Sequence, residues 1–305
     1  PISEVNEFSY KSKNNKVSHK CGHDGHTTIL LGLAKLISKF PLKDSAVYLL
    51  WQPAEETGEG AKSVLNDPFF KDLKINHVFA LHNLPRYNES NIIIKSGNFT
   101  PEVKSIIIKL EGKTSHAAEI ENGINPAIAI AELIKFFASI TNNSPDSKDF
   151  YLATPIYSNL GSRSYGISAG NGELHYTLRA WDPELFNNNS KLIDSKLKEI
   201  YSKYKIKSSI NWTGEFSANI NSPSAVDHIR DAAIDLELNI IEQKSPMKWG
   251  EDFGLFTQKY KGAMFGVGNG INSAALHNPD YDFNDKIIGT SISIFYSIIE
   301  EISNN

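Results

Sequence analysis

The spacing of apolar residues divides the first part of the chain into helical and extended segments. Between residues 26 and 40 apolar side chains recur every three or four positions, which predicts an amphipathic helix that stops at Pro41. Short apolar runs at residues 46–52 and 78–82 are typical of strands buried on both faces. The segment GAKSVLND between them predicts another helix. This alternation of helix and strand predicts an α/β layer.

The pattern changes near residue 100. Six segments follow in the order strand, helix, strand, strand, helix, strand, at residues 104–112, 125–140, 150–158, 172–181, 190–204 and 206–216. This order predicts a small antiparallel sheet with two helices on one face, a ferredoxin-like arrangement. Helix and strand alternate again from about residue 219, ending in a helix over residues 285–302. The predicted fold is an α/β domain with a mixed sheet, residues 1–100 and 217–305, interrupted by an inserted α+β domain, residues 101–216.

Composition and charge limit the classes of partner. The chain has 305 residues, of which 40% are hydrophobic and 22% charged, and its net charge is only −4. These values are typical of a soluble globular protein and imply neither a nucleic-acid nor a membrane partner. We expect no membrane span and no signal peptide, and therefore a cytoplasmic location. A single cysteine excludes an internal disulfide and suits a reducing compartment.

The stretch HKCGHDGHT, residues 19–27, is rich in side chains that bind metals. Cys21 and His23 lie two positions apart, and an extended backbone would point both toward one cation. The alternative is a buried structural cysteine beside a surface histidine. Asp24 could cap the helix or support a ligating histidine, and His26 could simply lie at the helix start.

Two adjacent carboxylates, Glu55 and Glu56, follow the first apolar run in QPAEETGEG. Neighbouring residues of an extended segment point to opposite sides, so one can bind metal while the other faces the reacting water. Metal-assisted hydrolysis requires this division between a ligand and a base. The alternative is a solvated acidic turn.

Two more histidines stand at suitable positions. His82 ends the apolar run VFALH, at the carboxyl end of a strand, where active sites of α/β sheets usually lie. His277 lies in ALHNPDYDFND, and each of the two could equally be a hydrogen-bonded structural residue. The candidate donors of sulfur, nitrogen and oxygen type are Cys21, His23, Glu56, His82 and His277. Five such donors suggest two divalent ions, and Zn²⁺, Mn²⁺, Co²⁺ and Ni²⁺ all accept this set.

Other polar residues allow two interpretations, one functional and one structural. In the inserted domain, GKTSHAAEIENGINP places His116 between a strand and a helix, where it serves either function or packing. Glu251 and Asp252 in KWGEDFG either cap a helix or line a site. The glycine-rich stretch over residues 165–173 lacks the context of a phosphate loop and predicts a turn near a cleft.

Six motifs follow one another along the chain in this order: CGHDGH, PAEE, LH, GKTSHAA, GEDF and LHNPDYDFND. Together they resemble the dinuclear metallo-amidohydrolases that include hippurate hydrolase, auxin-conjugate (indole-acetyl amino acid) hydrolases and N-acetyl-diaminopimelate deacetylase, over essentially the whole chain. The resemblance implies a catalytic metal-binding domain and an inserted lid or dimerisation domain. It implies two metal ions, Zn or Mn with Co or Ni as alternatives, on the five donors named above. It also implies that Glu55 is the general base and that His116 helps bind the substrate or its oxyanion, sometimes across a dimer.

The activity implied is hydrolysis of the amide bond of an N-acyl amino acid or a similar small conjugate. Water bound by the metals would attack the acyl carbonyl, Glu55 would carry the proton, and His116 would stabilise the oxyanion. The expected partners are a small-molecule substrate and, through the inserted domain, a second copy of the chain. Alternatives are a dipeptidase or carboxypeptidase with the same metals, and a catalytically inactive metal-binding fragment.

The chain departs from the family pattern in two places. Because it begins with Pro1, we expect that the family's leading segment is missing and that the sheet of the catalytic domain is incomplete. YGISAG replaces an Asn-Val-Ile-Pro-Asp-like segment, so that Gly166 takes the place of a substrate-contacting asparagine. Arg179 in the next strand either meets a substrate carboxylate or is an ordinary surface arginine.

Overall fold

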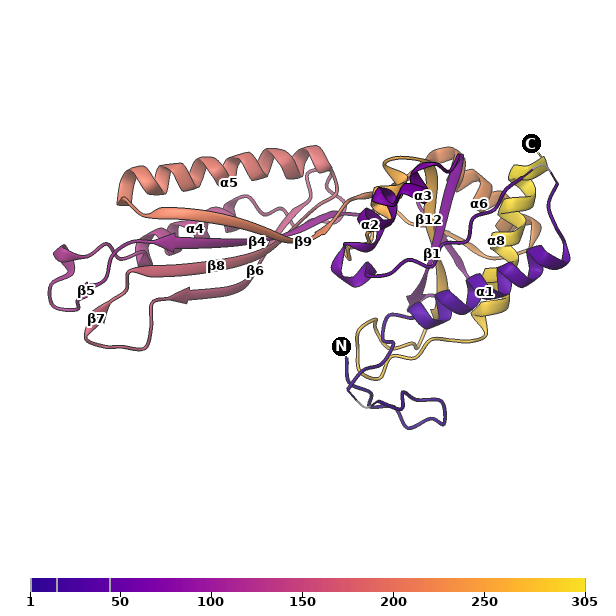
Figure 1. Ribbon diagram of the computed structural model, residues 1–305, viewed down its shortest axis with the longest axis horizontal. Helices are drawn as coiled ribbons and strands as arrows, with labels where there is room; N and C mark the ends of the chain where they lie inside the picture. The colour runs from indigo at the N-terminus through magenta and orange to yellow at the C-terminus, as the bar shows by residue number, and fades with distance from the viewer. Residues whose placement is uncertain (1, 15, 44, 305) are drawn as a thin grey trace.

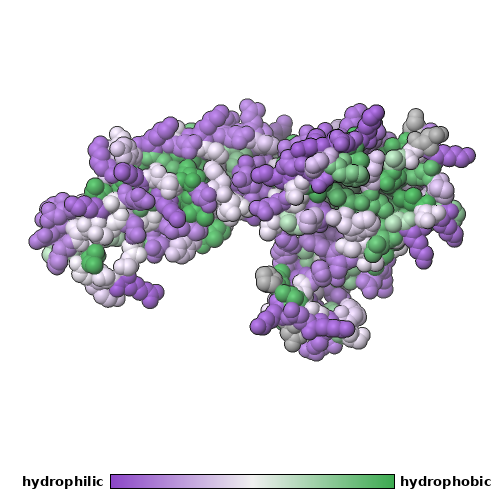
Figure 2. Space-filling model, in the orientation of Figure 1, coloured by the Kyte–Doolittle hydropathy of each residue, from purple (hydrophilic) through white to green (hydrophobic). Residues whose placement is uncertain are grey.

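The computed structural model describes residues 2–14, 16–43 and 45–304 and shows two lobes joined end to end (Figure 1). The first lobe contains the two ends of the chain, and the second is formed by its middle part. On the visible face, hydrophobic residues form separate patches on the two lobes, and the surface where the lobes join is largely hydrophilic (Figure 2). Within the described ranges, none of the helices combines the length and apolarity needed to cross a membrane.

A mixed four-stranded sheet forms the centre of the first lobe. Its strands, in spatial order, are β1 (His77–Pro85), β12 (Lys261–Gly270), β2 (Ile92–Ile94) and β11 (Ile240–Glu242). β1 runs parallel to β12 and β2 runs parallel to β11, whereas β12 and β2 are antiparallel.

Helices pack against both faces of this sheet. The helices on one face share a core with Leu81 of β1, and they are α1 (His23–Lys39), α6 (Pro223–Asp235) and α8 (Ile287–Asn304). The helices on the other face pack with Val78 of β1, and they are α2 (Gly60–Asn66), α3 (Pro68–Lys71) and α7 (Gly254–Thr257). Residues 78 and 81 of one strand point to opposite faces, because side chains alternate along a strand.

The second lobe is an antiparallel sheet with two helices on one face, as the sequence predicts. The strands, in spatial order, are β6 (Tyr151–Leu160), β8 (Asn171–Ala180), β4 (Glu102–Glu111) and β9 (Lys207–Phe216). The helices α4 (Ala127–Ser139) and α5 (Pro183–Tyr204) share one core with the alternate, inward-facing residues of these strands. Short strands β3 (Gly97–Thr100) and β10 (Asn219–Asn221) pair where the lobes join.

Two local predictions differ from the structure. The strand predicted at residues 46–52 does not form, and Tyr48, Leu50 and Trp51 are 51%, 40% and 45% exposed. A strand needs a hydrogen-bonding neighbour, and among the described residues none pairs with this run. The helix predicted at 190–204 begins earlier, at Pro183, because the Asp182 side chain accepts a hydrogen bond from the Glu184 amide and caps the helix.

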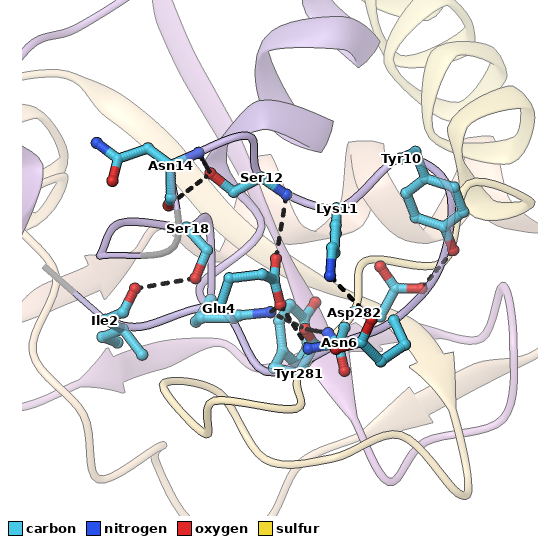
Figure 3. Close-up of polar contacts among 12 residues, drawn as sticks. Ile2, Glu4, Asn6, Tyr10, Lys11, Ser12, Asn14, Ser18, Tyr281 and Asp282 are labelled. Atoms are coloured by element: carbon cyan, nitrogen blue, oxygen red, sulfur yellow. Dashed lines mark hydrogen bonds and ion pairs between the residues drawn. The ribbon is translucent and has the colours of Figure 1, made fainter.

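The segment that precedes α1 packs against the loop that precedes α8, as Figure 3 shows. Its centre is the ion pair between Glu4 and Lys20, whose nitrogen and oxygen lie 2.8 Å apart. The Glu4 carboxylate also accepts hydrogen bonds from the amides of Asn6 and Ser12. Burial raises the pKa of Glu4, but the hydrogen bonds from Lys20 and the two amides outweigh it and lower that pKa from 4.5 to about 2.

This low pKa predicts a pH-dependent contribution to stability. The folded pKa lies below the unfolded one, so the Glu4 carboxylate stabilises the fold above about pH 4.5, and that contribution is lost as pH falls toward 2. The difference in unfolding free energy between the wild type and Glu4→Gln, measured by urea titration, should therefore shrink between neutral pH and pH 3. A constant difference would contradict the assignment.

Candidate metal centre

The five candidate donors come from four segments, and the structure brings their donor atoms together. They are Cys21 and His23 at the start of α1, Glu56 in the short helix η1 (Glu55–Thr57), His82 in β1, and His277 in the loop before α8. Single donor atoms of Cys21, His23 and His82 lie within 4.8 Å of one another. The same holds for Cys21, Glu56 and His277. Because Cys21 belongs to both clusters, its sulfur lies between two positions that a cation can occupy.

The backbone between Cys21 and His23 is not extended, so the argument that predicted this pair was wrong. Gly22 has a φ of 99°, in the left-handed region, and α1 begins directly after it at His23. A side chain at position 22 would also collide with the Asn83 side chain. Glycine is therefore the residue that can turn the chain here and leave both donors on one side.

His82 lies within β1 rather than at its end, because the strand continues to Pro85. Its Nδ1 donates a hydrogen bond to the carbonyl of Asn83 at 2.8 Å, which leaves Nε2 facing the Cys21 sulfur at 3.4 Å. Burial lowers the pKa of His82 to about 4, so the imidazole is neutral at pH 7. A neutral ring with its free nitrogen directed at the cluster is the form that binds a cation.

Glu55 and Glu56 lie on a helical turn rather than an extended segment, so the argument that pointed them to opposite sides was wrong, and oxygens of both lie within 4.8 Å of each other beside His23. The His23 ring lies between them, with Nε2 3.6 Å from a Glu55 oxygen and Nδ1 3.9 Å from a Glu56 oxygen. That Glu56 oxygen is also 3.4 Å from Nε2 of His277. The two carboxylates therefore have different surroundings, as the division between ligand and base requires.

Glu251 and Asp252 line the site. Oxygen atoms of these two residues and of Glu55 lie within 4.8 Å of one another, and the side chains are only 6% and 1% exposed. Asp252 accepts hydrogen bonds from the Gln52 amide at 2.8 Å and from the Ala61 backbone at 2.9 Å, which closes the loop that carries Glu55. The sequence left their role open, since nothing local distinguishes a buried acid from a helix cap.

The donor set fits two divalent cations. Among the described residues, no lysine or arginine pairs with Glu55, Glu56, Glu251 or Asp252, although these carboxylates crowd together. Burial, and then the charges of the neighbouring glutamates, raise the pKa of the Cys21 thiol far above its usual range. A cation would reverse this effect, because a coordinating thiol is deprotonated. The role of the five residues as ligands stays a prediction.

Three residues near the centre were missed by the sequence reasoning. Asn83 contacts the His26 ring and donates to the Tyr281 hydroxyl, and the Trp249 ring lies 5.0 Å from the His82 ring. Their only signal was position: Asn83 and Trp249 adjoin the motifs LH and GEDF, and Tyr281 lies within LHNPDYDFND. Asp24 is exposed and accepts a hydrogen bond from the amide of Gly25. Among the described residues no hydrogen bond joins it to a candidate ligand, so support of a ligating histidine stays a prediction for it.

His116 does not lie at this centre within one chain. It belongs to the two-residue strand β5 (Ser115–His116), which pairs with β7 (Ile167–Ser168) at the tip of the second lobe. Figure 1 shows that tip at the opposite end of the molecule from α1. The ten residues of β4 span roughly 33 Å and carry the chain away from the first lobe.

Comparisons with known proteins agree with this arrangement. Residues 1–301 match the sequence profile of Peptidase family M20/M25/M40. The chain belongs to this family. Hippurate hydrolase from Campylobacter jejuni, a relative, is 31% identical over 301 residues, which cover 97% of this chain and 77% of that protein.

Other relatives have similar coverage. N-acetyl-L-cysteine deacetylase from Bacillus subtilis is 29% identical over 100% of this chain and 73% of its own length. N-acetyldiaminopimelate deacetylase from Bacillus licheniformis is 27% identical over 99% of this chain and 80% of its own length. The M20/M25/M40 chain described here is accordingly a hydrolase.

Solved structures share the fold. The Bacillus subtilis YXEP protein, a dinuclear metal binding peptidase from the M20 family, superimposes with a TM-score of 0.85 at 22% identity, covering 100% of this chain and 79% of that one. The aminobenzoyl-glutamate utilization protein from Klebsiella pneumoniae gives 0.67 at 17% identity, covering 90% and 67%. The predicted fold class, an α/β domain with a mixed sheet and an inserted α+β domain, is confirmed.

The crowded acids predict how the metal-free protein responds to pH. Burial raises the pKa of Glu55 from 4.5 to about 7; the hydrogen bond with Glu251 lowers it in part, and the charges of Glu56 and Asp252 raise it. Burial also raises the pKa of Glu251 well above its usual value. A folded pKa above the unfolded one gives stability that is present below about pH 4.5 and is lost as pH rises through 7. With chelator present, the wild type should therefore lose unfolding free energy between about pH 5 and about pH 8, and Glu251→Gln should lose less. Glu121→Gln, an exposed acid on the second lobe, is the control, and an equal loss in all three proteins would contradict the coupling.

Proposed function

We propose that the chain is a metal-dependent hydrolase that cleaves the amide bond of N-acyl amino acids or similar small conjugates. The observation that carries the proposal is the pair of donor clusters that share Cys21, with Glu55 next to them. The names of three relatives support the substrate class, since hippurate, N-acetyl-L-cysteine and N-acetyldiaminopimelate are all N-acyl amino acids.

The proposed metal ligands are the five residues that meet at the two clusters, Cys21, His23, Glu56, His82 and His277. Their mixed donors suit Zn²⁺ or Mn²⁺, and Co²⁺ or Ni²⁺ as alternatives. Bound by these residues, two such ions would supply Lewis-acid polarisation of an acyl carbonyl and would lower the pKa of water in the site.

Glu55 is the proposed general base. It lies beside the proposed ligand His23, with a carboxylate oxygen 3.6 Å from Nε2 of that ring, within reach of a water at the two clusters. It takes a proton from the attacking water and later delivers it to the leaving amine. Asp252 holds both ends of the loop that carries Glu55, so this carboxylate is kept in place during the transfer.

The inserted domain, residues 101–216, is proposed as a lid and dimerisation domain, and residues 1–100 and 217–305 as the catalytic domain. β6 is an edge strand, and its Ile156, Tyr157 and Leu160 are 60%, 50% and 41% exposed. An exposed edge with apolar side chains favours pairing with another chain. A second copy could then bring the exposed His116 to the substrate, where its donor would stabilise the oxyanion.

Peptide hydrolysis with the same metals is a second candidate, because the matching family is described as a peptidase family. The two candidates separate on a panel of acetyl-, benzoyl- and indole-acetyl-amino acids against dipeptides. Faster turnover of the dipeptides would replace the first proposal with the second.

Arg179 donates a hydrogen bond to the backbone carbonyl of Lys248 at 3.1 Å, so its side chain already has a protein partner where the lobes join.

The adjacent glutamates provide a matched test of the two roles. Glu55→Gln should keep close to two metal ions per chain and lose turnover by about 10²–10⁴-fold, because only the base is removed. Glu56→Gln should instead lose metal, because its carboxylate is a proposed ligand. Elemental analysis after Mn²⁺ or Zn²⁺ loading and the substrate panel measure both quantities. Full activity of Glu55→Gln would exclude it as the base.

Complementation tests whether His116 acts from a second copy. In a dimer that exchanges this residue, a chain with Glu55→Gln and a chain with His116→Ala together form one intact site. Mixing equal amounts of the two inactive variants and allowing subunits to exchange should restore about a quarter of wild-type activity. A mixture of Glu55→Gln with Glu56→Gln is the control and should stay inactive. No recovery in the first mixture would contradict a shared site.

A further inference from the structure

A buried lysine precedes the shared ligand Cys21. Lys20 is only 3% exposed, and its ammonium donates to a Glu4 oxygen at 2.8 Å and to the backbone carbonyl of Tyr281 at 3.0 Å. A buried charge is costly unless it is paired and hydrogen-bonded, and here it has both kinds of partner. The side chain therefore has one defined position.

Lys20 contacts the loop before α8 at two points. Its backbone carbonyl accepts a hydrogen bond from the amide of His277 at 2.7 Å, and its ammonium reaches Tyr281 four residues later. His277 has a φ of 65°, in the left-handed region that residues with a side chain rarely adopt. Such a conformation persists where neighbouring contacts enforce it.

Tyr281 connects this loop with the strand that carries His82. Its side chain is fully buried, its hydroxyl accepts a hydrogen bond from the side chain of Asn83, and its carbonyl accepts one from Asn6 as well as the one from Lys20. Figure 3 shows the side chain of Asn6 beside Tyr281. The segment around Lys20, the loop with His277 and strand β1 are thus tied together at one residue.

Burial cannot hold the side chain of His277, which is 54% exposed, whereas His82 is 4% exposed. The position of His277 relative to Cys21 and Glu56 must then come from its backbone contacts. A buried ion pair adds little net stability over an apolar pair of the same size, so stability alone does not explain Glu4 and Lys20. The hydrogen bonds of Lys20 to Glu4 and to the Tyr281 carbonyl do define the position of the loop before α8.

We propose that Lys20 is a positioning residue of the metal centre. Its ammonium, neutralised by Glu4, fixes Tyr281 and thereby places His277 beside Cys21 and Glu56. This rests on the proposed function, because it takes Cys21, Glu56 and His277 as ligands. Loosening the loop should weaken the cation position that includes His277 more than the one formed by Cys21, His23 and His82.

The test replaces the ion pair with neutral side chains of similar size, in the variant Glu4→Gln with Lys20→Met. Removing both charges together avoids leaving one buried charge unpaired, so the metal-free variant should unfold at a urea concentration close to that of the wild type. Its affinity for one of the two ions, measured by competition of Mn²⁺ or Zn²⁺ with a chromophoric chelator, should fall about 10–100-fold, as for other residues that orient ligands.

The matched control is an ion pair in the same segment that is exposed. Lys11 and Glu7 lie 2.9 Å apart with side chains 37% and 86% exposed, so Glu7→Gln with Lys11→Met removes the same chemistry without touching the loop. It should leave both metal affinities and stability unchanged. Unchanged affinity in the Glu4–Lys20 double variant as well would overturn the proposal.

A single variant separates the bond to Tyr281 from the pairing with Glu4, and because it leaves one buried charge unpaired, its metal affinity is measured only where urea titration shows it folded. Glu4→Gln keeps Lys20 and its bond to Tyr281, so it should lose stability while keeping wild-type metal affinity. Loss of affinity in folded Glu4→Gln would overturn the role of the Lys20–Tyr281 contact. If the wild type itself binds no metal after loading, the metal centre is refuted and this proposal with it, which separates the two failures.

Discussion

One thiol constrains the whole site, because Cys21 belongs to both donor clusters. Four segments must bring their donors to within a few ångströms of it. Burial, and then the charges of nearby carboxylates, raise the pKa of Cys21 and of Glu55, so the charged forms of these groups are unfavourable in the metal-free protein. The surrounding backbone therefore has to hold an arrangement that the side chains by themselves would not adopt.

Backbone contacts meet this requirement at each donor. Gly22 turns the chain between Cys21 and His23, the Asn83 carbonyl orients the ring of His82, and the Lys20 carbonyl holds the amide of His277. The side chain of Asp252 adds to these contacts, because it accepts hydrogen bonds from both ends of the loop with Glu55 and Glu56. Residues that are not themselves candidate ligands therefore orient the ligands, as is usual in metal and catalytic centres.

The second lobe packs independently of the metal centre. Its sheet has its own core, and its long strands carry His116 far from the donors. A single chain thus brings the candidate metal ligands and the candidate base together, whereas its candidate oxyanion donor, His116, lies far from them. Such a separation suits an enzyme in which substrate binding depends on how lobes or chains come together.

The sequence by itself determined the elements with a strong internal period, such as α1 and the alternating strand β8, and the residue types that can bind a cation. These depend on local preferences and on which side of an element is apolar. Only the tertiary structure decided that residues 46–52 remain outside a sheet, that Glu251 and Asp252 are buried at the site, and that His116 lies at the far tip. The physical reason is that a strand's hydrogen bonds, an acid's burial and a side chain's partners all depend on segments distant in sequence.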